Sequence, residues 1–249
     1  MFPLRNLIYS ITDHCNLKCE NCGAFNPFKK SKNNVNVDLF DSDIKAISKR
    51  FEISNFKLIG GEPLLHPELK RLLIICRKYL PKIDIRLTSN GITFLNKDES
   101  FYNILSILKI KLIISNYDLN INHDKIKELC DSHFIDFHLS RSKTHFWDFV
   151  DKTGTANVPV IFKKCREDLF YPEYYNGRIY NCCYSKNSSF LNETNRVDNA
   201  AVDVGLDISS TDAELENYLY KPCPTCKFCT FNTITKPWRQ LTKQEAENL

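Results

Sequence analysis

Short apolar runs alternate with amphipathic segments from the start of this chain to about residue 140. A short apolar run bounded by turn residues is typical of a buried strand, whereas apolar residues three or four positions apart are typical of a helix. The pattern predicts strands at 4–12, 56–59, 83–88, 110–115 and 134–139. It predicts helices at 41–51, 67–79, 99–108 and 123–130, the first of them with an aspartate as its cap.

Strands that alternate with helices of this length predict a parallel sheet with right-handed crossovers. The expected fold class is α/β, a partial (β/α)6 TIM-type barrel with a small cysteine-rich domain at its carboxyl end. In barrels of this type the functional residues gather at the carboxyl ends of the strands.

The alternation ends near residue 145. A hairpin is expected at 170–181, turning at Asn176-Gly177, and a helix at 211–220. Residues 185–210 are polar and irregular, and a cysteine-rich stretch follows the last helix. We expect two domains, a partial barrel at 1–150 and a smaller domain at 151–249.

Composition narrows the class of protein. The chain has 249 residues, 43% of them apolar, and a net charge of only +4, dispersed along its length, which does not indicate a nucleic-acid partner. No signal peptide is evident, and no apolar run approaches the ~18 residues of a membrane span. We therefore expect a cytoplasmic protein with no membrane partner. Its eleven cysteines would then bind metal or do chemistry rather than form disulfides.

Three of these cysteines follow the first predicted strand. Cys15, Cys19 and Cys22 have C-x3-C-x2-C spacing. Three thiolates on a short loop can hold three irons of a [4Fe–4S] cluster and leave the fourth iron open to another ligand. The alternative is a zinc site that takes His14 or a more remote residue as its fourth ligand.

A second motif follows the second predicted strand. In Gly60-Gly61-Glu62-Pro63 the two glycines allow a sharp turn and close approach of the backbone to a ligand. Their carbonyl groups could accept hydrogen bonds from an ammonium group, with the negative charge of Glu62 nearby.

Together these two motifs resemble those of radical S-adenosylmethionine (SAM) enzymes. The resemblance implies that Cys15, Cys19 and Cys22 hold a [4Fe–4S] cluster whose open iron binds SAM, and that Gly60–Pro63 binds the amino group of SAM. A flavodoxin- or ferredoxin-type donor would supply the electron for reductive cleavage of SAM, which would give a 5′-deoxyadenosyl radical. Asn21 stands where the family usually has an aromatic or apolar residue whose backbone contacts adenine.

Polar residues also follow the later strands. In the same family, segments like Thr88-Ser89-Asn90-Gly91 close the third strand, and a residue at the position of Ser115 contacts the SAM ribose. We accordingly include Ser89, Asn90 and Ser115 among the cofactor-binding candidates. Ser140 and Arg141 follow the fifth strand and could hold the SAM carboxylate or the substrate.

The remaining cysteines are mostly in the last third of the chain. Cys76 and Cys130 stand alone in apolar helices, where a buried core position is expected. The others resemble, with the hairpin, the shortened auxiliary-cluster ("twitch") domain of radical SAM enzymes such as the 2-deoxy-scyllo-inosamine dehydrogenases. This resemblance implies a second [4Fe–4S] cluster with four ligands: Cys165, Cys182, Cys226 and Cys229. Cys183 or Cys223 could replace a neighbouring ligand. A zinc ribbon would suit four thiolates equally well.

An auxiliary cluster can accept an electron from a substrate radical, which predicts oxidation of a C–H beside a hydroxyl, with Arg141 or His138 as the base. There are three alternatives. The protein could catalyse a redox-neutral epimerisation with Cys183 as hydrogen donor, it could be a peptide-modifying maturase, or it could be a zinc-binding or electron-carrier protein. Peptide-modifying relatives often carry a separate leader-peptide-binding domain, whereas this chain starts directly at its first predicted strand. Its ending near Cys226–Phe231 resembles that of radical SAM proteins of glycan gene clusters. Both points favour a small-molecule substrate such as a sugar, aminocyclitol or nucleotide sugar.

Overall fold

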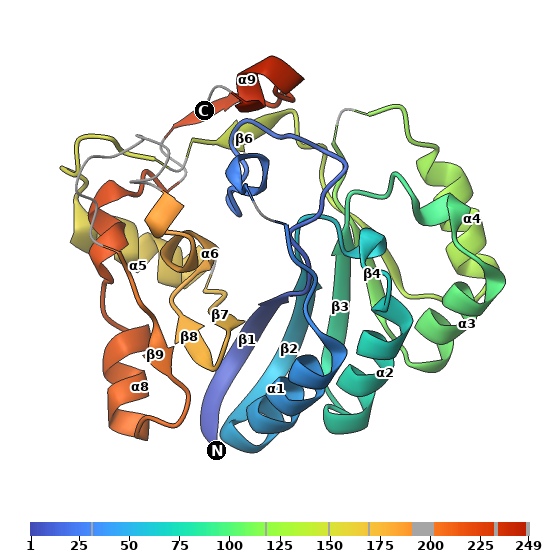
Figure 1. Cartoon of the computed structure of the whole chain (residues 1–249), viewed down its shortest axis with the longest axis horizontal. Coiled ribbons are helices and arrows are strands. Elements are labelled where there is room, and N and C mark those ends of the chain that lie inside the picture. Colours follow the sequence, from blue (N-terminus) through green and yellow to red (C-terminus); the bar gives the residue numbers. More distant parts are fainter. Residues whose placement is uncertain are drawn as a thin grey trace. The chain divides into compact units, whose positions relative to one another are not determined.

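The computed structural model describes residues 1–30, 32–117, 119–148, 150–168, 170–190, 202–231 and 234–247 (Figure 1). By their contacts the residues form two compact units. The first comprises Met1–Asn16 and Ser31–Thr144, and the second comprises Leu17–Lys30 and His145–Leu249. The assignment of separate functions to 1–150 and 151–249 stays a prediction.

The first unit is built on five parallel strands in the order β5-β4-β3-β2-β1. The strands are β1 (Phe2–Ser10), β2 (Phe51–Ile59), β3 (Asp84–Ser89), β4 (Lys111–Ile114) and β5 (Phe137–Leu139). The helices between them are α1 (Val37–Arg50), α2 (Leu69–Tyr79), α3 (Glu99–Ile107) and α4 (His123–Ser132). This confirms the predicted α/β fold of the partial TIM-barrel type.

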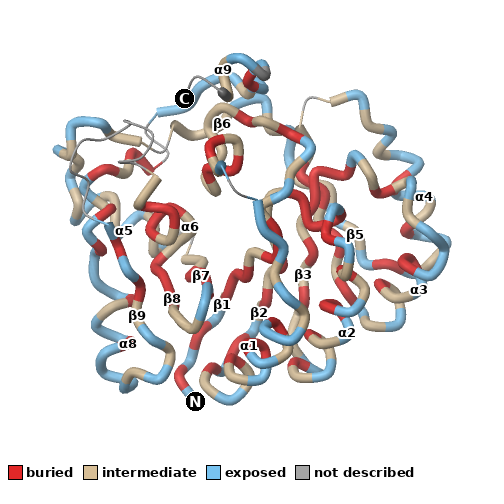
Figure 2. The backbone as a smooth tube through the Cα atoms, in the orientation of Figure 1, coloured by how far each residue is buried: buried red, intermediate tan, exposed pale blue. Residues whose placement is uncertain are grey.

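The register of the sheet brings its carboxyl ends to one edge. Ser10 pairs with Ile59 at the ends of β1 and β2, and Ser89 pairs with Ile114, which in turn pairs with Leu139. Buried and less buried positions alternate along β3, so one face of this strand packs into the core (Figure 2). Each loop that follows a strand therefore starts at the same edge.

The first helix differs from its prediction at both ends. It begins at Val37, and its cap is Asn36 rather than an aspartate, because the Asn36 side chain accepts hydrogen bonds from the backbone N–H groups of Asp38 and Leu39. It ends at Arg50, and β2 begins at the next residue. The predicted short strand at 56–59 is thus the second half of a nine-residue strand.

The two isolated cysteines lie in the core, as predicted. Cys76 in α2 and Cys130 in α4 are fully buried. Burial raises the pKa of both thiols, that of Cys130 to about 12, so both stay protonated at neutral pH.

The second unit contains two antiparallel sheets. β7 (Glu173–Tyr175) and β8 (Arg178–Tyr180) form the predicted hairpin, and β9 (Leu206–Asp207) pairs with β8. Asn176 and Gly177 both have positive φ, 49° and 75°, which is the geometry of a two-residue hairpin turn. In the other sheet β6 (His145–Trp147) pairs with β10 (Thr235–Pro237). The helices are α5 (Val158–Asp168), α6 (Cys183–Lys186), α8 (Asp212–Leu219) and α9 (Lys243–Glu247).

Residues 17–30 belong to the second unit because of an aromatic core. Phe25 and Phe28 pack in a buried cluster with Tyr184, Phe228 and Leu241. The rings of Phe25 and Tyr184 stack with centroids 5.9 Å apart. The segment that contains Cys19 and Cys22 is thus anchored on elements more than a hundred residues away along the chain. None of the described helices is long and apolar enough to cross a membrane.

Candidate functional site

The predicted SAM-binding residues of the first unit lie in loops at one edge of its sheet. Backbone hydrogen bonds join the residue that follows β1, β4 or β5 to the last residue of a neighbouring strand. Ile11 N–H donates to Ile59 O (2.8 Å), Ser115 N–H donates to Ser89 O (2.8 Å) and Ser140 N–H donates to Ile114 O (2.9 Å). The sheet thus brings together residues that are up to 129 positions apart in the sequence.

The Gly60–Pro63 turn is bound tightly to the loop after β1. Gly61 N–H donates to Thr12 O (2.6 Å), and Glu62 N–H donates to His14 O (2.7 Å), next to Cys15. A Cβ atom on Gly60 would lie 2.6 Å from Thr12 O, so only glycine fits there. No described residue donates a hydrogen bond to the carbonyl oxygen of Gly60 or Gly61, which leaves both able to accept from a ligand.

Both oxygens of the Glu62 carboxylate accept hydrogen bonds from groups within the protein. It accepts hydrogen bonds from Leu64 N–H (3.0 Å), Ser89 Oγ (2.7 Å) and Asn90 N–H (2.7 Å). Its side chain is 1% exposed, and burial raises its pKa, although these hydrogen bonds oppose the rise. Glu62 therefore fixes the turn after β2 to the turn after β3, so contact with the ammonium group would fall to the glycine carbonyls.

Asn90 connects these turns to the loop of the first cysteine. Its Nδ2 donates to Oδ1 of Asn16, the residue after Cys15 (2.7 Å). Its Oδ1 accepts from Ile92 N–H (3.0 Å), which holds the side chain from both ends. Gly91, the next residue, has a φ of 83° and lets the chain turn away from the sheet.

The candidates at the ends of β4 and β5 differ in burial. Ser115 is buried, and the Ser140 hydroxyl accepts from Asn116 N–H (3.0 Å). His138 and Arg141, the predicted bases, are both exposed, and no described residue forms a hydrogen bond or ion pair with either side chain. Their catalytic role stays a prediction.

Cys19 and Cys22 lie in the second unit, four and seven residues beyond Cys15 in the sequence. Residues from the carboxyl end of the chain enclose this segment. Trp238 Nε1 donates to Cys19 Sγ (3.4 Å), and the Arg239 guanidinium forms two hydrogen bonds to the Glu20 carboxylate (2.8 and 3.0 Å). Leu241 N–H donates to Lys18 O (2.8 Å). Asn21, the adenine candidate, lies within this enclosed turn.

The late cysteines gather in the second unit. Cys223 Sγ and Cys226 Sγ are 3.5 Å apart. The hydrogen bond between them lowers the pKa of Cys223 and raises that of Cys226, so Cys223 is the group that ionises first. Burial raises the pKa of Cys182, and that of Cys229 to about 11, and Cys223 adds to both effects. The charge of Cys165 also raises the pKa of Cys229.

Cys183 follows Cys182 and, after burial, contributes most to the raised pKa of Cys182. Burial raises the pKa of Cys183 itself to about 12, with smaller effects from Glu173, Lys186 and Cys22. Cys223, predicted as a substitute for a neighbouring cluster ligand, lies among the late cysteines, 3.5 Å from Cys226. Which four of them bind a cluster stays a prediction.

The residues around the late cysteines fit a cluster. Arg166, next to Cys165, has a buried Nε and a buried Nη1 with no hydrogen-bond partner among the described residues. A cluster held by four thiolates is anionic, so it would supply the acceptors that these N–H groups need. In the described part of the chain, no three His, Cys, Asp or Glu side chains converge as ligands of a single metal ion.

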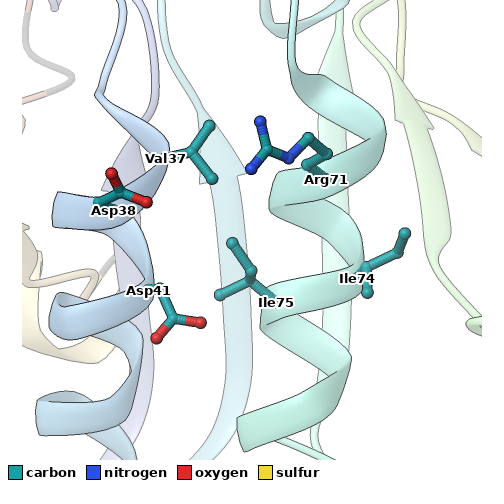
Figure 3. A pocket seen from close by; sticks show the side chains of 6 residues that line it. All are labelled: Val37, Asp38, Asp41, Arg71, Ile74 and Ile75. Carbon is teal, nitrogen blue, oxygen red and sulfur yellow. The ribbon is translucent and has the colours of Figure 1, made fainter.

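A pocket of about 380 Å³ lies elsewhere, between α1 and α2 (Figure 3). Its lining residues are Val37, Asp38, Asp41, Arg71, Ile74 and Ile75. Asp41 is already paired with Lys78 (3.2 Å), and Arg71 with Glu68 (3.1 Å). None of the predicted site residues lines this pocket.

Four contributors to the site were not predicted from the sequence: Asn16, Arg166, Trp238 and Arg239. Asn16 is in the cysteine loop, so its position was a usable signal. Trp238 is one of only two tryptophans, but no spacing rule connects it with a cysteine 219 residues earlier.

Comparison with known proteins places the first unit in a family. Residues 9–136, about half of the chain, match the model of the Radical SAM superfamily. BtrN, solved in complex with AdoMet and 2-DOIA, has a similar fold (TM-score 0.60, 16% identity, 94% of this chain and 96% of BtrN). So has anSMEcpe with bound AdoMet and the Cp18Cys peptide (TM-score 0.55, 16% identity, 91% and 82% covered).

Curated relatives match over a shorter length. The GTP 3′,8-cyclase of Aquifex aeolicus (strain VF5) is 32% identical over 93 residues, 36% of this chain and 29% of the relative. That of Staphylococcus carnosus (strain TM300) is 27% identical over 142 residues, 52% and 42% of the two chains. The matches thus span less than half the length of these relatives. On the family match to residues 9–136, this chain belongs to the radical SAM superfamily.

Proposed function

We propose that this protein oxidises a C–H bond beside a hydroxyl group in a sugar, aminocyclitol or nucleotide sugar, using the [4Fe–4S] cluster and SAM that its family implies. The observation that supports oxidation most is a second group of cysteines, in which Cys223 Sγ and Cys226 Sγ are 3.5 Å apart and Arg166, next to Cys165, has two buried N–H donors without an acceptor among the described residues. When bound, SAM and the first cluster supply the radical that removes a hydrogen atom, and a second cluster supplies an acceptor for the electron left on the substrate.

The residues of the first unit would bind and orient SAM. Cys15, together with Cys19 and Cys22, would hold the first cluster. The carbonyl groups of Gly60 and Gly61 would accept from the SAM ammonium group, in a turn that Glu62 and Asn90 make rigid. A rigid turn favours catalysis because the protein needs no reordering when the cofactor binds.

Oxidation of an alcohol also requires removal of a proton. The substrate loses one hydrogen atom from carbon, one electron and the hydroxyl proton, and its C–O bond becomes a carbonyl. The imidazole of His138 in β5 would take that proton, whereas the guanidinium of Arg141, just beyond β5, is already protonated and would instead hold the substrate. Their exposure leaves them accessible to a substrate.

The similarity to BtrN supports this substrate class, because the BtrN structure holds 2-DOIA together with AdoMet. The similarity extends over nearly the whole of both chains. The GTP 3′,8-cyclases and the peptide-bound anSMEcpe show that the family also has other substrates. A peptide is accordingly an alternative outcome of the experiment below.

One observation favours a second candidate, epimerisation. The thiol of Cys183 is kept protonated by burial, which raises its pKa to about 12. A protonated thiol can return a hydrogen atom to a carbon radical. An epimerase would therefore need Cys183, whereas an oxidase would not.

The test is isotope transfer under anaerobic, reducing conditions. Sugars, aminocyclitols and nucleotide sugars deuterated at carbons beside hydroxyl groups are incubated with the protein, SAM and a reductant. The proposal expects deuterium in 5′-deoxyadenosine and a product two hydrogens lighter than the substrate. An epimer that has exchanged its deuterium for solvent hydrogen would identify the second candidate. Transfer only from peptides, or no reductant-dependent SAM cleavage, would refute the proposal.

A further inference from the structure

The side chain of Arg166 is positioned in an unusual way for a residue in an amphipathic helix. It lies in α5 directly after Cys165, and its guanidinium lies between the rings of Phe162 (4.4 Å) and Phe170 (4.3 Å). Two aromatic faces hold the guanidinium plane in place and remove it from water. The group is therefore fixed, although its neighbours Lys163 and Lys164 are exposed.

One end of the guanidinium is bound by a buried amide. Arg166 Nη2 donates to Oδ1 of Asn181, the residue before Cys182. Asn181 is 1% exposed, and its Nδ2 donates to Tyr218 O in α8 (3.1 Å), so its orientation is also fixed. Arg166 is thus connected to two cysteines, by a covalent bond to Cys165 and by a hydrogen bond to the neighbour of Cys182.

The other N–H groups of Arg166 have no such partner. Its Nε and Nη1 are buried, and no described residue accepts a hydrogen bond from either atom. A buried N–H group without an acceptor costs about 1–3 kcal/mol, and more when it is charged. A fixed cation with two unused donors therefore indicates an anionic ligand.

The cysteines that lie next to Arg166 in the fold identify this ligand. Cys165 precedes Arg166 in α5, and Cys182 follows Asn181, which accepts from Nη2. Helix α5 also packs against the short helical segment Pro224–Phe228, which contains Cys226. An anion at this place is one that the cysteines themselves would hold.

We infer that Arg166 is a positioning residue of the auxiliary cluster, which donates N–H hydrogen bonds to cluster or thiolate sulfur and raises the cluster's reduction potential. This inference rests on the proposed function, since it requires the second cluster. A nearby positive charge and hydrogen bonds to sulfur both stabilise the more negative, reduced state. Arg166 would thereby make the cluster a better acceptor for the substrate's electron.

The experiment measures the reduction potential rather than turnover. Full-length protein with Cys15, Cys19 and Cys22 replaced by alanine retains only the auxiliary cluster, and an EPR-monitored redox titration gives its midpoint potential. Three further substitutions are compared in this background: Arg166→Gln, Arg166→Lys and, as a matched control, Lys164→Met on the exposed face of the same helix. Iron and sulfide analysis of each variant accompanies the titration.

We expect a more negative potential for Arg166→Gln, a smaller shift for Arg166→Lys, which keeps the charge, and no shift for Lys164→Met. If Arg166→Gln does not retain the cluster, the shift of Arg166→Lys decides. A potential equal to that of the parent in every variant that retains the cluster would overturn the inference and leave Arg166 a purely structural residue. Absence of iron and sulfide from the parent itself would instead refute the second cluster, and with it the proposed function.

Discussion

Asn90 Nδ2 and Asn16 Oδ1 are joined by a hydrogen bond of 2.7 Å that links the end of β3 to the loop of Cys15. The two residues are 74 positions apart, and the Asn90 backbone also donates to Glu62. This pair therefore connects three strand-end loops whose residues would act together on SAM.

The first prediction concerns this pair. Asn16→Ala and Asn90→Ala should each destabilise the protein, and the double variant should lose less than the sum of the two. We expect a coupling free energy of about 0.5–1.5 kcal/mol, since one shared hydrogen bond is removed. Urea unfolding of the four proteins measures it. Strictly additive losses would mean that the hydrogen bond does not form in solution.

The second prediction concerns Gly60. Gly60→Ala would place a methyl group 2.6 Å from Thr12 O and displace the turn, so SAM affinity should fall by at least about tenfold, equal to ~1.4 kcal/mol. Equilibrium dialysis with the reconstituted protein measures the affinity. Gly177→Ala is the control, because its Cβ would meet nothing within 4 Å and its positive φ makes it cost stability only. Equal SAM affinity in both variants would contradict the role of Gly60.

The third prediction concerns pH. Because burial raises the pKa of Glu62, the folded chain binds this proton more tightly than the unfolded chain does. The stability that Glu62 contributes is therefore present below its ordinary pKa of 4.5 and is lost as pH rises towards the folded value. The wild-type free energy of unfolding, relative to Glu62→Gln, should decrease with rising pH above 4.5. An increase over the same interval would show that the three hydrogen bonds outweigh burial.

The fourth prediction concerns Trp238. Trp238→Phe keeps a ring but removes the N–H donor to Cys19, so the reduction potential of the first cluster should become more negative. A redox titration monitored by EPR measures this. The control is Trp147→Phe, which changes the other tryptophan, packed against Phe231 with ring centroids 6.1 Å apart. Identical potentials in wild type and Trp238→Phe would exclude the hydrogen bond as a determinant.

Local patterns were sufficient to predict the strand–helix order and the hairpin at Asn176-Gly177. The apolar periodicity that predicts buried strands depends on neighbours within a few residues, and the two positive φ angles suit the Asn-Gly pair. The same reasoning placed Cys76 and Cys130 in the core correctly, because thiols in apolar helices are usually buried.

Contacts between distant residues were not predictable in this way. Glu20 binds Arg239 across 219 positions, and nothing in either local sequence indicates the other. Arg166 follows two lysines in an amphipathic helix and would be assigned to the solvent face; only tertiary packing places it between two aromatic rings. Similarly, Glu62 appeared to be a ligand-facing charge, but the fold turns its carboxylate towards Ser89 and Asn90.

The proposed oxidation requires two iron–sulfur clusters, and the iron and sulfide content of anaerobically purified protein tests their presence most directly. We predict about eight iron and about eight sulfide per chain, and about four of each after Cys15, Cys19 and Cys22 are replaced by alanine. Zinc without sulfide, or the loss of all iron in the triple variant, would contradict it.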